Sequence, residues 1–219
     1  METRQHKNAF TLAEVLVTLT IIGVIASMAI PTLLQSTQNA ELKTAWKQNY
    51  AILSQTVNKL QLDTGSNLEE YSVTMHSFET ELKPYIQMIS DSTGDLLYPQ
   101  ALITTTYKDM SGNPVNGRLM DDGQFIMNNG ALVMIENYPP YNTPLMLWVD
   151  VNGFEKGPNI LGKDLYGAEV VGHNRLLPMG ANSMTQVDCP CSKAVCQVTK
   201  WPGYGALNLA GAGCSSSHM

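Results

Sequence analysis

Residues 10–34 read FTLAEVLVTLTIIGVIASMAIPTLL, and this apolar stretch decides the fold of the N-terminal part of the chain. Glu14 is its only ionisable side chain, and the 20 residues from Val15 to Leu34 carry no charge. As an α-helix, a segment of that length spans about 30 Å, the thickness of the hydrocarbon core of a bilayer. A carboxylate costs roughly 2.5–3.5 kcal/mol at the centre of such a helix and less near the interface, so Glu14 requires an explanation. We predict a transmembrane helix over residues 10–34.

The segment that precedes this helix predicts its orientation. Residues 1–9 are polar and include Arg4 and Lys7, and basic residues beside a span hold that side in the cytoplasm. We therefore expect a single-pass protein of the cytoplasmic (inner) membrane, with a cytoplasmic N-terminus. Everything after Leu34 is then extracytoplasmic.

A secretory signal peptide is an alternative for the same stretch. Ser27-Met28-Ala29 has the small-x-small pattern of a cleavage site. Against this, the apolar core would exceed the usual length of about 7–15 residues and would contain an acid. An uncleaved signal anchor is a second alternative.

The residues at the start of the helix carry a specific resemblance. Ala9, then Phe10-Thr11-Leu12-Ala13-Glu14, then an apolar helix with Gly23 and Pro31, resemble the N-terminus of type IV prepilins and type II secretion pseudopilins. The resemblance implies that residues 1–9 are a leader peptide, that a prepilin peptidase cuts between Ala9 and Phe10, and that the new amine is methylated. It also implies that Gly23 and Pro31 weaken the helix inside a filament. One departure is Ala9, because the family usually has glycine before the cut.

Electrostatics gives Glu14 a role in such a protein. Cleavage before Phe10 creates a cationic amine at the membrane edge, which Glu14 cannot easily reach in its own chain but can reach in a staggered neighbour. Pairing neutralises two charges that would each be costly in a medium of low dielectric constant. We predict that Glu14 sets the axial register of assembly, as one polar residue does in a coiled coil. An incidental interfacial acid is the alternative.

The helix is predicted to continue beyond the membrane as an amphipathic helix over residues 35–62. Apolar side chains recur there at spacings of four, four, three, four and three, which is one helical face: Leu42, Trp46, Tyr50, Leu53, Val57 and Leu60. We expect one helix from about Phe10 to Gln61, bent at Pro31, because proline removes a backbone hydrogen bond.

Residues 63–219 are predicted to form an extracytoplasmic α+β head, in which a small antiparallel sheet packs on the amphipathic helix. Fifteen of the 17 glycines follow residue 90, so the head is rich in turns. Tight turns need the positive φ that Gly and Asn accept, which predicts hairpins at Asp121–Gly123 and Asn128–Gly130. The expected elements are a short helix at 77–89, a loop at 90–116 and strands at 118–120, 124–127, 131–136 and 145–151.

The stretch from Trp148 to Tyr166, WVDVNGFEKGPNILGKDLY, is the candidate for metal binding. Asp150, Asn152 and Asp164 offer oxygen ligands suited to calcium, although the spacing is not that of an EF-hand. Major pseudopilins often bind calcium in a loop after their sheet, so the resemblance favours this site. The alternative is a strand that ends in an Asn-Gly turn, with Asp150 and Asn152 bonded to the backbone.

The cysteines lie near the C-terminus and predict disulfides. An even number in an exported, turn-rich segment indicates two bonds among Cys189, Cys191, Cys196 and Cys214. A bond between Cys189 and Cys191 would be badly strained, which leaves two pairings. Zinc is the rival, but the spacing lacks the paired C-x2-C motifs of common zinc sites.

The sequence gives little support for catalysis or for nucleic-acid binding. It contains no Gly-x-Ser-x-Gly, Walker or His-Glu-x-x-His motif, so we expect no enzyme and no required cofactor, with calcium as the one candidate. The net charge is −6 and the basic residues are scattered, which disfavours contact with DNA or RNA.

The combined interpretation is a structural subunit of a type II secretion pseudopilus or a type IV pilus-like filament. Its implied partners are other pilin or pseudopilin subunits, prepilin peptidase and an inner-membrane assembly platform. Assembled subunits would lie in the periplasm or at the cell surface. The alternatives are a membrane-tethered extracytoplasmic binding domain that does not polymerise, and a secreted domain released after Ala29.

Overall fold

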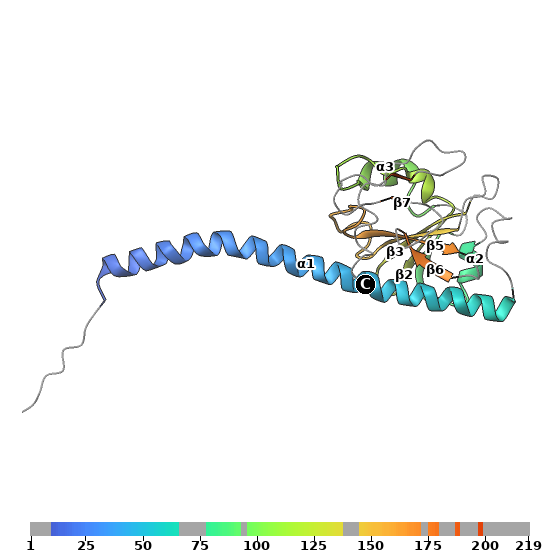
Figure 1. The fold of residues 1–219 in the computed structure, drawn as a ribbon, viewed down its shortest axis with the longest axis horizontal. Helices are drawn as coiled ribbons and strands as arrows, with labels where there is room; N and C mark the ends of the chain where they lie inside the picture. Colours follow the sequence, from blue (N-terminus) through green and yellow to red (C-terminus); the bar gives the residue numbers. More distant parts are fainter. Residues whose placement is uncertain are drawn as a thin grey trace, which may run out of the picture. The chain divides into compact units, whose positions relative to one another are not determined.

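The computed structural model describes residues 10–65, 78–92, 96–137, 145–171 and 175–179, and the backbone of two short strands at 187–188 and 197–198. The chain divides into two compact units, Met1–Glu41 and Leu42–Met219. Helix α1 (Leu12–Thr64) runs through both units (Figure 1).

Helix α1 confirms the prediction of one long N-terminal helix. It has 53 residues and continues through Pro31 without interruption. Of the six apolar residues that define the predicted stripe, Trp46, Leu53, Val57 and Leu60 are buried, whereas Leu42 and Tyr50 are half-buried. The amphipathic pattern therefore identified the packed face of the helix.

The second unit contains a six-stranded antiparallel sheet. Its spatial order, β1-β2-β3-β4-β5-β6, is also the order in the sequence, so the sheet is a meander. With α1 it makes an α+β fold, as predicted. The strands are β1 (Met88–Asp91), β2 (Gly123–Met127), β3 (Leu132–Glu136), β4 (Met146–Asp150), β5 (Leu165–Val171) and β6 (Arg175–Pro178). Strands β7 (Val187–Asp188) and β8 (Gln197–Val198) form a separate pair.

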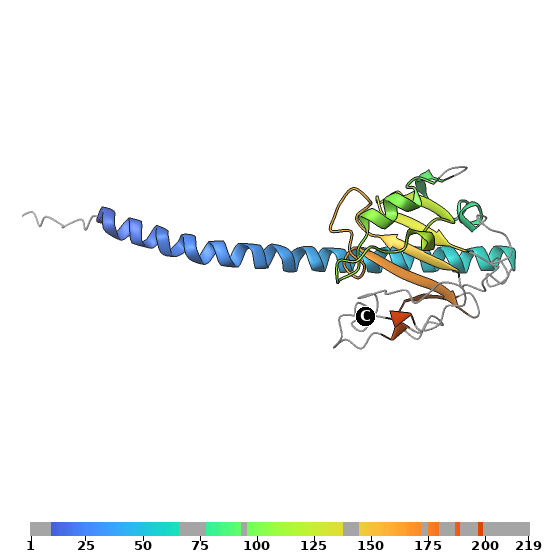
Figure 2. The same ribbon diagram turned by 90° about the horizontal axis from the view of Figure 1, so that it is seen from above.

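Within this unit, each face of the large sheet has its own apolar core. The second half of α1 packs on one face, where the Trp46 ring stacks on Tyr166 with 4.9 Å between centroids. The other face lies beneath α3 (Gln100–Thr106) and its neighbouring loops, with Trp148 and Tyr107 fully buried. Figures 1 and 2 show these three layers, with the sheet between α1 and α3.

Two predicted elements near the first hairpin are wrong. Residues 118–120 do not form a strand, because Gly117–Leu119 is a 3-10 helix (η2) in which the Asn116 side chain accepts a hydrogen bond from the Arg118 amide. Asp121–Gly123 is consequently no hairpin turn. The second predicted hairpin is confirmed: β2 and β3 pair across Asn128–Gly130, with φ +86° at Gly130.

The predicted helix at 77–89 and the predicted loop at 90–116 are also only partly correct. Helix α2 covers Phe78–Leu82 and stops before Pro84, which disfavours helical backbone at the preceding residue. Met88 and Ile89 belong to β1 instead, and α3 lies inside the predicted loop. Strands β5 and β6 were not predicted.

Candidate functional site

The first turn of α1 holds Glu14 in a reciprocal hydrogen-bonded cap. The Thr11 amide and hydroxyl each donate to Oε2 of Glu14 at 2.8 Å, and the Glu14 amide donates to the Thr11 hydroxyl at 3.3 Å. Because α1 begins at Leu12, Thr11 is the N-cap residue and Glu14 is at N3, which is a capping box. The pattern Thr-x-x-Glu is the sequence signal of this cap, which was not among the predicted features.

The cap leaves part of the Glu14 carboxylate available. Among the described residues, Oε1 of Glu14 receives no hydrogen bond, and Phe10, four residues earlier, is 86% exposed. Thr11 would keep both of its donor groups after a cut before Phe10. One carboxylate oxygen can therefore stabilise the helix while the other pairs with a cation from another molecule.

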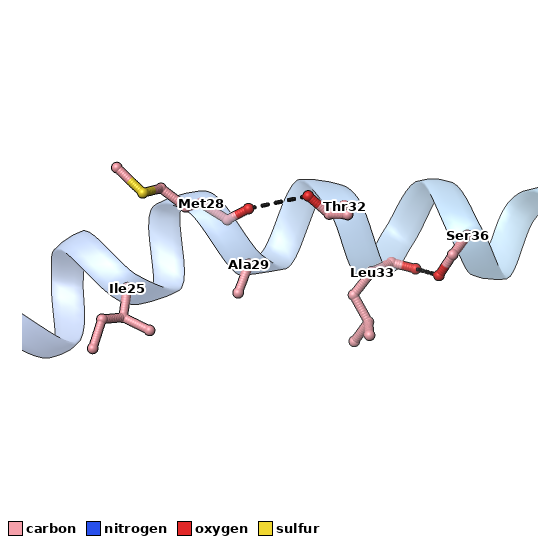
Figure 3. A pocket seen from close by; sticks show the side chains of 6 residues that line it. All are labelled: Ile25, Met28, Ala29, Thr32, Leu33 and Ser36. Carbon is pink, nitrogen blue, oxygen red and sulfur yellow. Dashed lines mark hydrogen bonds between the residues drawn. The ribbon is translucent and has the colours of Figure 1, made fainter.

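The helix that follows exposes its apolar side chains on all sides. Within the described residues, α1 is the one helix long and apolar enough to cross a membrane by length and composition. Figure 3 shows a shallow groove along it, where Ala29 leaves a gap between Ile25 and Leu33. An apolar surface of this extent is normally covered by lipid or by other helices.

Hydroxyl groups on this helix are bonded to its own backbone. Each donates to a carbonyl three or four residues earlier, which satisfies the hydroxyl without water. The six residues are Thr18, Thr20, Ser27, Thr32, Ser36 and Thr37. Serine and threonine are thus compatible with an apolar environment around this helix.

Gly23 and Pro31 do not interrupt the helix in the single chain, and the predicted bend at Pro31 stays a prediction. A Cβ added at Gly23 would have no atom within 4 Å, so packing within this chain does not require glycine there. Pro31 lies inside α1 and does not end it. Their predicted role in weakening the helix within a filament stays a prediction.

The segment around Asp150 forms a compact network of hydrogen bonds. Asp150, at the end of β4, accepts the Tyr107 hydroxyl at 2.6 Å and the amides of Asn152 and Gly153 at 3.2 and 3.0 Å. Asp164 accepts the amides of Asn159 and Ile160 at 2.6 and 2.7 Å.

The Asn152 side chain completes this network, because its amide nitrogen donates to the carbonyls of Lys156 and Gly157. This is the backbone-bonded turn that was the alternative to calcium. The carboxylate oxygens of Asp150 and Asp164 already have protein donors, and calcium binding by this segment stays a prediction.

Burial raises the pKa of Asp150 to about 6, from an ordinary value of 3.8. The hydrogen bond from Tyr107 opposes this rise, and the nearby Asp164 carboxylate adds to it. Since the folded state holds this proton more tightly than the unfolded state, the stabilisation is complete below pH 3.8 and is lost as the pH rises through 6.

We expect the free energy of unfolding to fall by about 1–3 kcal/mol between pH 4 and pH 7 through this one carboxyl group. The measurement is urea unfolding of the detergent-solubilised chain at both values. Asp150→Asn is the control, because it removes the titrating group and should reduce the pH dependence by that amount. An unchanged pH dependence in the variant would contradict the assignment.

Some predicted site residues fall outside the described part of the chain. These are Ala9, on the leader side of the predicted cut, and the cysteines Cys189, Cys191, Cys196 and Cys214. The predicted processing at Ala9 and the predicted disulfides therefore stay predictions.

Comparison with known proteins identifies the N-terminal segment. Residues 4–30 match the family model described as the prokaryotic N-terminal methylation motif, which is the signature of prepilins and pseudopilins. No curated protein and no solved structure matches the chain. The motif supports a type IV pilin-like protein that is processed by prepilin peptidase, and its apolar helix fits a single-pass anchor in the inner membrane.

Proposed function

Because residues 4–30 carry the methylation motif of prepilins, we propose that this chain is a structural subunit of a type II secretion pseudopilus or of a type IV pilus-like filament. The observation that carries the proposal is the combination of that motif with a helix whose apolar side chains are exposed on every side. Lipid covers this helix before assembly, and the helices of other subunits cover it afterwards.

Glu14 would direct the assembly. The methylated amine of Phe10 in an incoming subunit pairs with the Oε1 atom that the capping box leaves available, while Thr11 holds Oε2. In an apolar bundle the pair is strongly favoured over two unpaired charges, so it selects one axial offset between neighbours. Polymerisation, rather than catalysis, is then the activity of the protein.

The proposed partners follow from this role. They are prepilin peptidase, an inner-membrane assembly platform, and other pilin or pseudopilin subunits in a homo- or hetero-filament. The N-terminus would lie in the cytoplasm before processing, and the head would lie in the periplasm or at the cell surface. Of the two filament types, the Asp150–Asp164 segment favours a type II secretion pseudopilus, where calcium in such a loop would be expected.

The experiment that tests assembly is expression with a matching assembly system, followed by shearing of the cells. The proposal predicts filaments that contain this chain in the sheared fraction, visible by electron microscopy. A membrane-tethered binding domain, which is the alternative, would stay entirely in the membrane fraction and would give no filaments.

A further inference from the structure

Three carboxylates meet at one end of the sheet, on segments predicted to be a turn and a strand. Asp121 and Asp122 directly precede β2, and Glu136 ends β3. The antiparallel register pairs Gly123 with Ile135, and the Asp122 amide donates to the Ile135 carbonyl at 3.0 Å. One carboxylate oxygen from each of the three residues lies within 4.8 Å of the other two.

Two members of this carboxylate cluster are buried, and one of them has an oxygen atom without a hydrogen bond. Glu136 is 1% exposed and Asp122 is 6% exposed. Asp122 accepts the Asn137 amide at 2.6 Å, whereas Oε2 of Glu136 is buried without a hydrogen bond. A buried carboxylate oxygen without a donor is costly, and adjacent like charges add to that cost. The pKa of Glu136 is accordingly raised to about 9 by burial and by the charges of Asp122 and Asp121.

We propose that Asp121, Asp122 and Glu136 bind a calcium ion. Hard divalent cations prefer oxygen ligands, and calcium coordinates them at about 2.3–2.6 Å, so two ligands on opposite sides of the ion lie about 4.6–5.2 Å apart. The three carboxylate oxygens, which lie within 4.8 Å of one another, are therefore spaced closely enough to bind one calcium ion. Its charge compensates the three carboxylates, including the buried carboxylate of Glu136, whose Oε2 has no hydrogen bond. Water would complete the coordination sphere.

This site is separate from the Asp150–Asp164 segment. In the β3–β4 register Glu136 pairs with Met146, whereas Asp150 pairs with Leu132. These two cross-strand pairs are four residues apart along β3, which corresponds to about 13 Å in a strand. A response to calcium at one site can therefore be separated from a response at the other by substitution.

Calcium at this position would link the residues before the start of β2 to the end of β3. With three protein carboxylates we expect a dissociation constant of about 10⁻⁴ M, in the range of extracellular calcium modules. At 10 mM calcium this affinity gives about a 100-fold shift of the folding equilibrium, which raises the melting temperature by roughly 5 °C or more.

The test is thermal unfolding of the full chain in detergent, after EGTA treatment and with CaCl2 or MgCl2 added. The wild type should gain about 5 °C with calcium and less with magnesium, because magnesium requires shorter bonds and sheds its water reluctantly. Glu136→Gln should lose the calcium response. Without calcium, this variant should unfold close to the wild-type temperature, since a neutral amide then replaces a buried carboxyl group that its raised pKa keeps neutral. That second result separates loss of the ion from a folding defect.

Two further variants keep the proposal falsifiable. Asp121 is only half-buried, so Asp121→Asn should fold and should need about tenfold more calcium for the same stabilisation. Asp150→Asn should retain the response. The proposal is overturned if the wild type does not respond to calcium, if magnesium stabilises it and calcium does not, or if Glu136→Gln responds normally while Asp150→Asn does not.

Discussion

Replacing Glu14 with alanine is expected to abolish filament assembly while the chain still accumulates in the membrane. The variant removes the Glu14 half of the capping box and the carboxylate that pairs with the Phe10 amine of a neighbour, whereas the Thr11 hydroxyl can still accept from the amide of residue 14. Leaving one charge of a buried pair uncompensated costs about 3–5 kcal/mol, which corresponds to a loss of roughly 10²–10⁴-fold at each subunit addition. The measurement is the amount of this chain in sheared filaments relative to the membrane fraction.

Glu14→Gln is the matched variant that separates the two roles of this side chain. Glutamine at N3 can still accept hydrogen bonds from Thr11 and so preserves the capping box, but it carries no charge. We expect it to fail in assembly nearly as severely as Glu14→Ala. Normal filaments from Glu14→Gln would show that Glu14 serves only to start the helix.

The largest effect on the stability of the head is expected for Leu53→Ala. Leu53 lies on the face of α1 that packs against the sheet, is 1% exposed and belongs to the same core as Val133 and Leu147. Removing a buried leucine side chain in this way destabilises a protein by about 2–5 kcal/mol, because the lost burial adds to a cavity. The measurement is urea unfolding of the detergent-solubilised chain, followed by tryptophan fluorescence.

Ile52→Ala is the control for this substitution. Ile52 is the preceding residue in the same helix but is 38% exposed, so its truncation should cost less than about 1 kcal/mol. Equal losses of stability for the two variants would contradict the packing of α1 against the sheet.

The long helix could be predicted from the sequence because two strong patterns follow each other. The length of the uncharged stretch after Glu14 matches the thickness of a bilayer as a helix. The apolar stripe that includes Trp46 and Leu53 matches the period of an α-helix. Both depend only on residues close together in the chain. The hairpin at Asn128–Gly130 was predictable for the same reason, since its turn requires a positive φ at Gly130.

Strand β5 could not be predicted in this way because its glycine serves packing rather than a turn. A Cβ at Gly167 would lie 3.0 Å from the Trp148 ring and even closer to the Met179 sulfur. Trp148 is its partner in β4, so the need for glycine arises only when the strands pair. Because glycine in a sequence usually predicts a turn, a strand that contains glycine for packing, such as β5, is not recognised from the sequence.

The candidate sites show the same division between local and long-range information. The capping box of Thr11 and Glu14 was visible in the sequence as Thr-x-x-Glu. The carboxylate cluster was not visible, because it needs the register of β2 and β3 to bring Glu136 to Asp122. Asp121-Asp122-Gly123 alone has the composition of an ordinary turn.

Mass spectrometry of the mature N-terminus, on protein isolated from its native host, is the most direct test of prepilin processing. If the chain is processed as a prepilin, the first peptide begins with N-methylated Phe10 and lacks residues 1–9. A chain that begins at Ile30 would contradict it, because that cut removes Glu14 and most of the apolar helix. An intact N-terminus at Met1 would also contradict it, because no amine would then exist at Phe10 for Glu14 to bind.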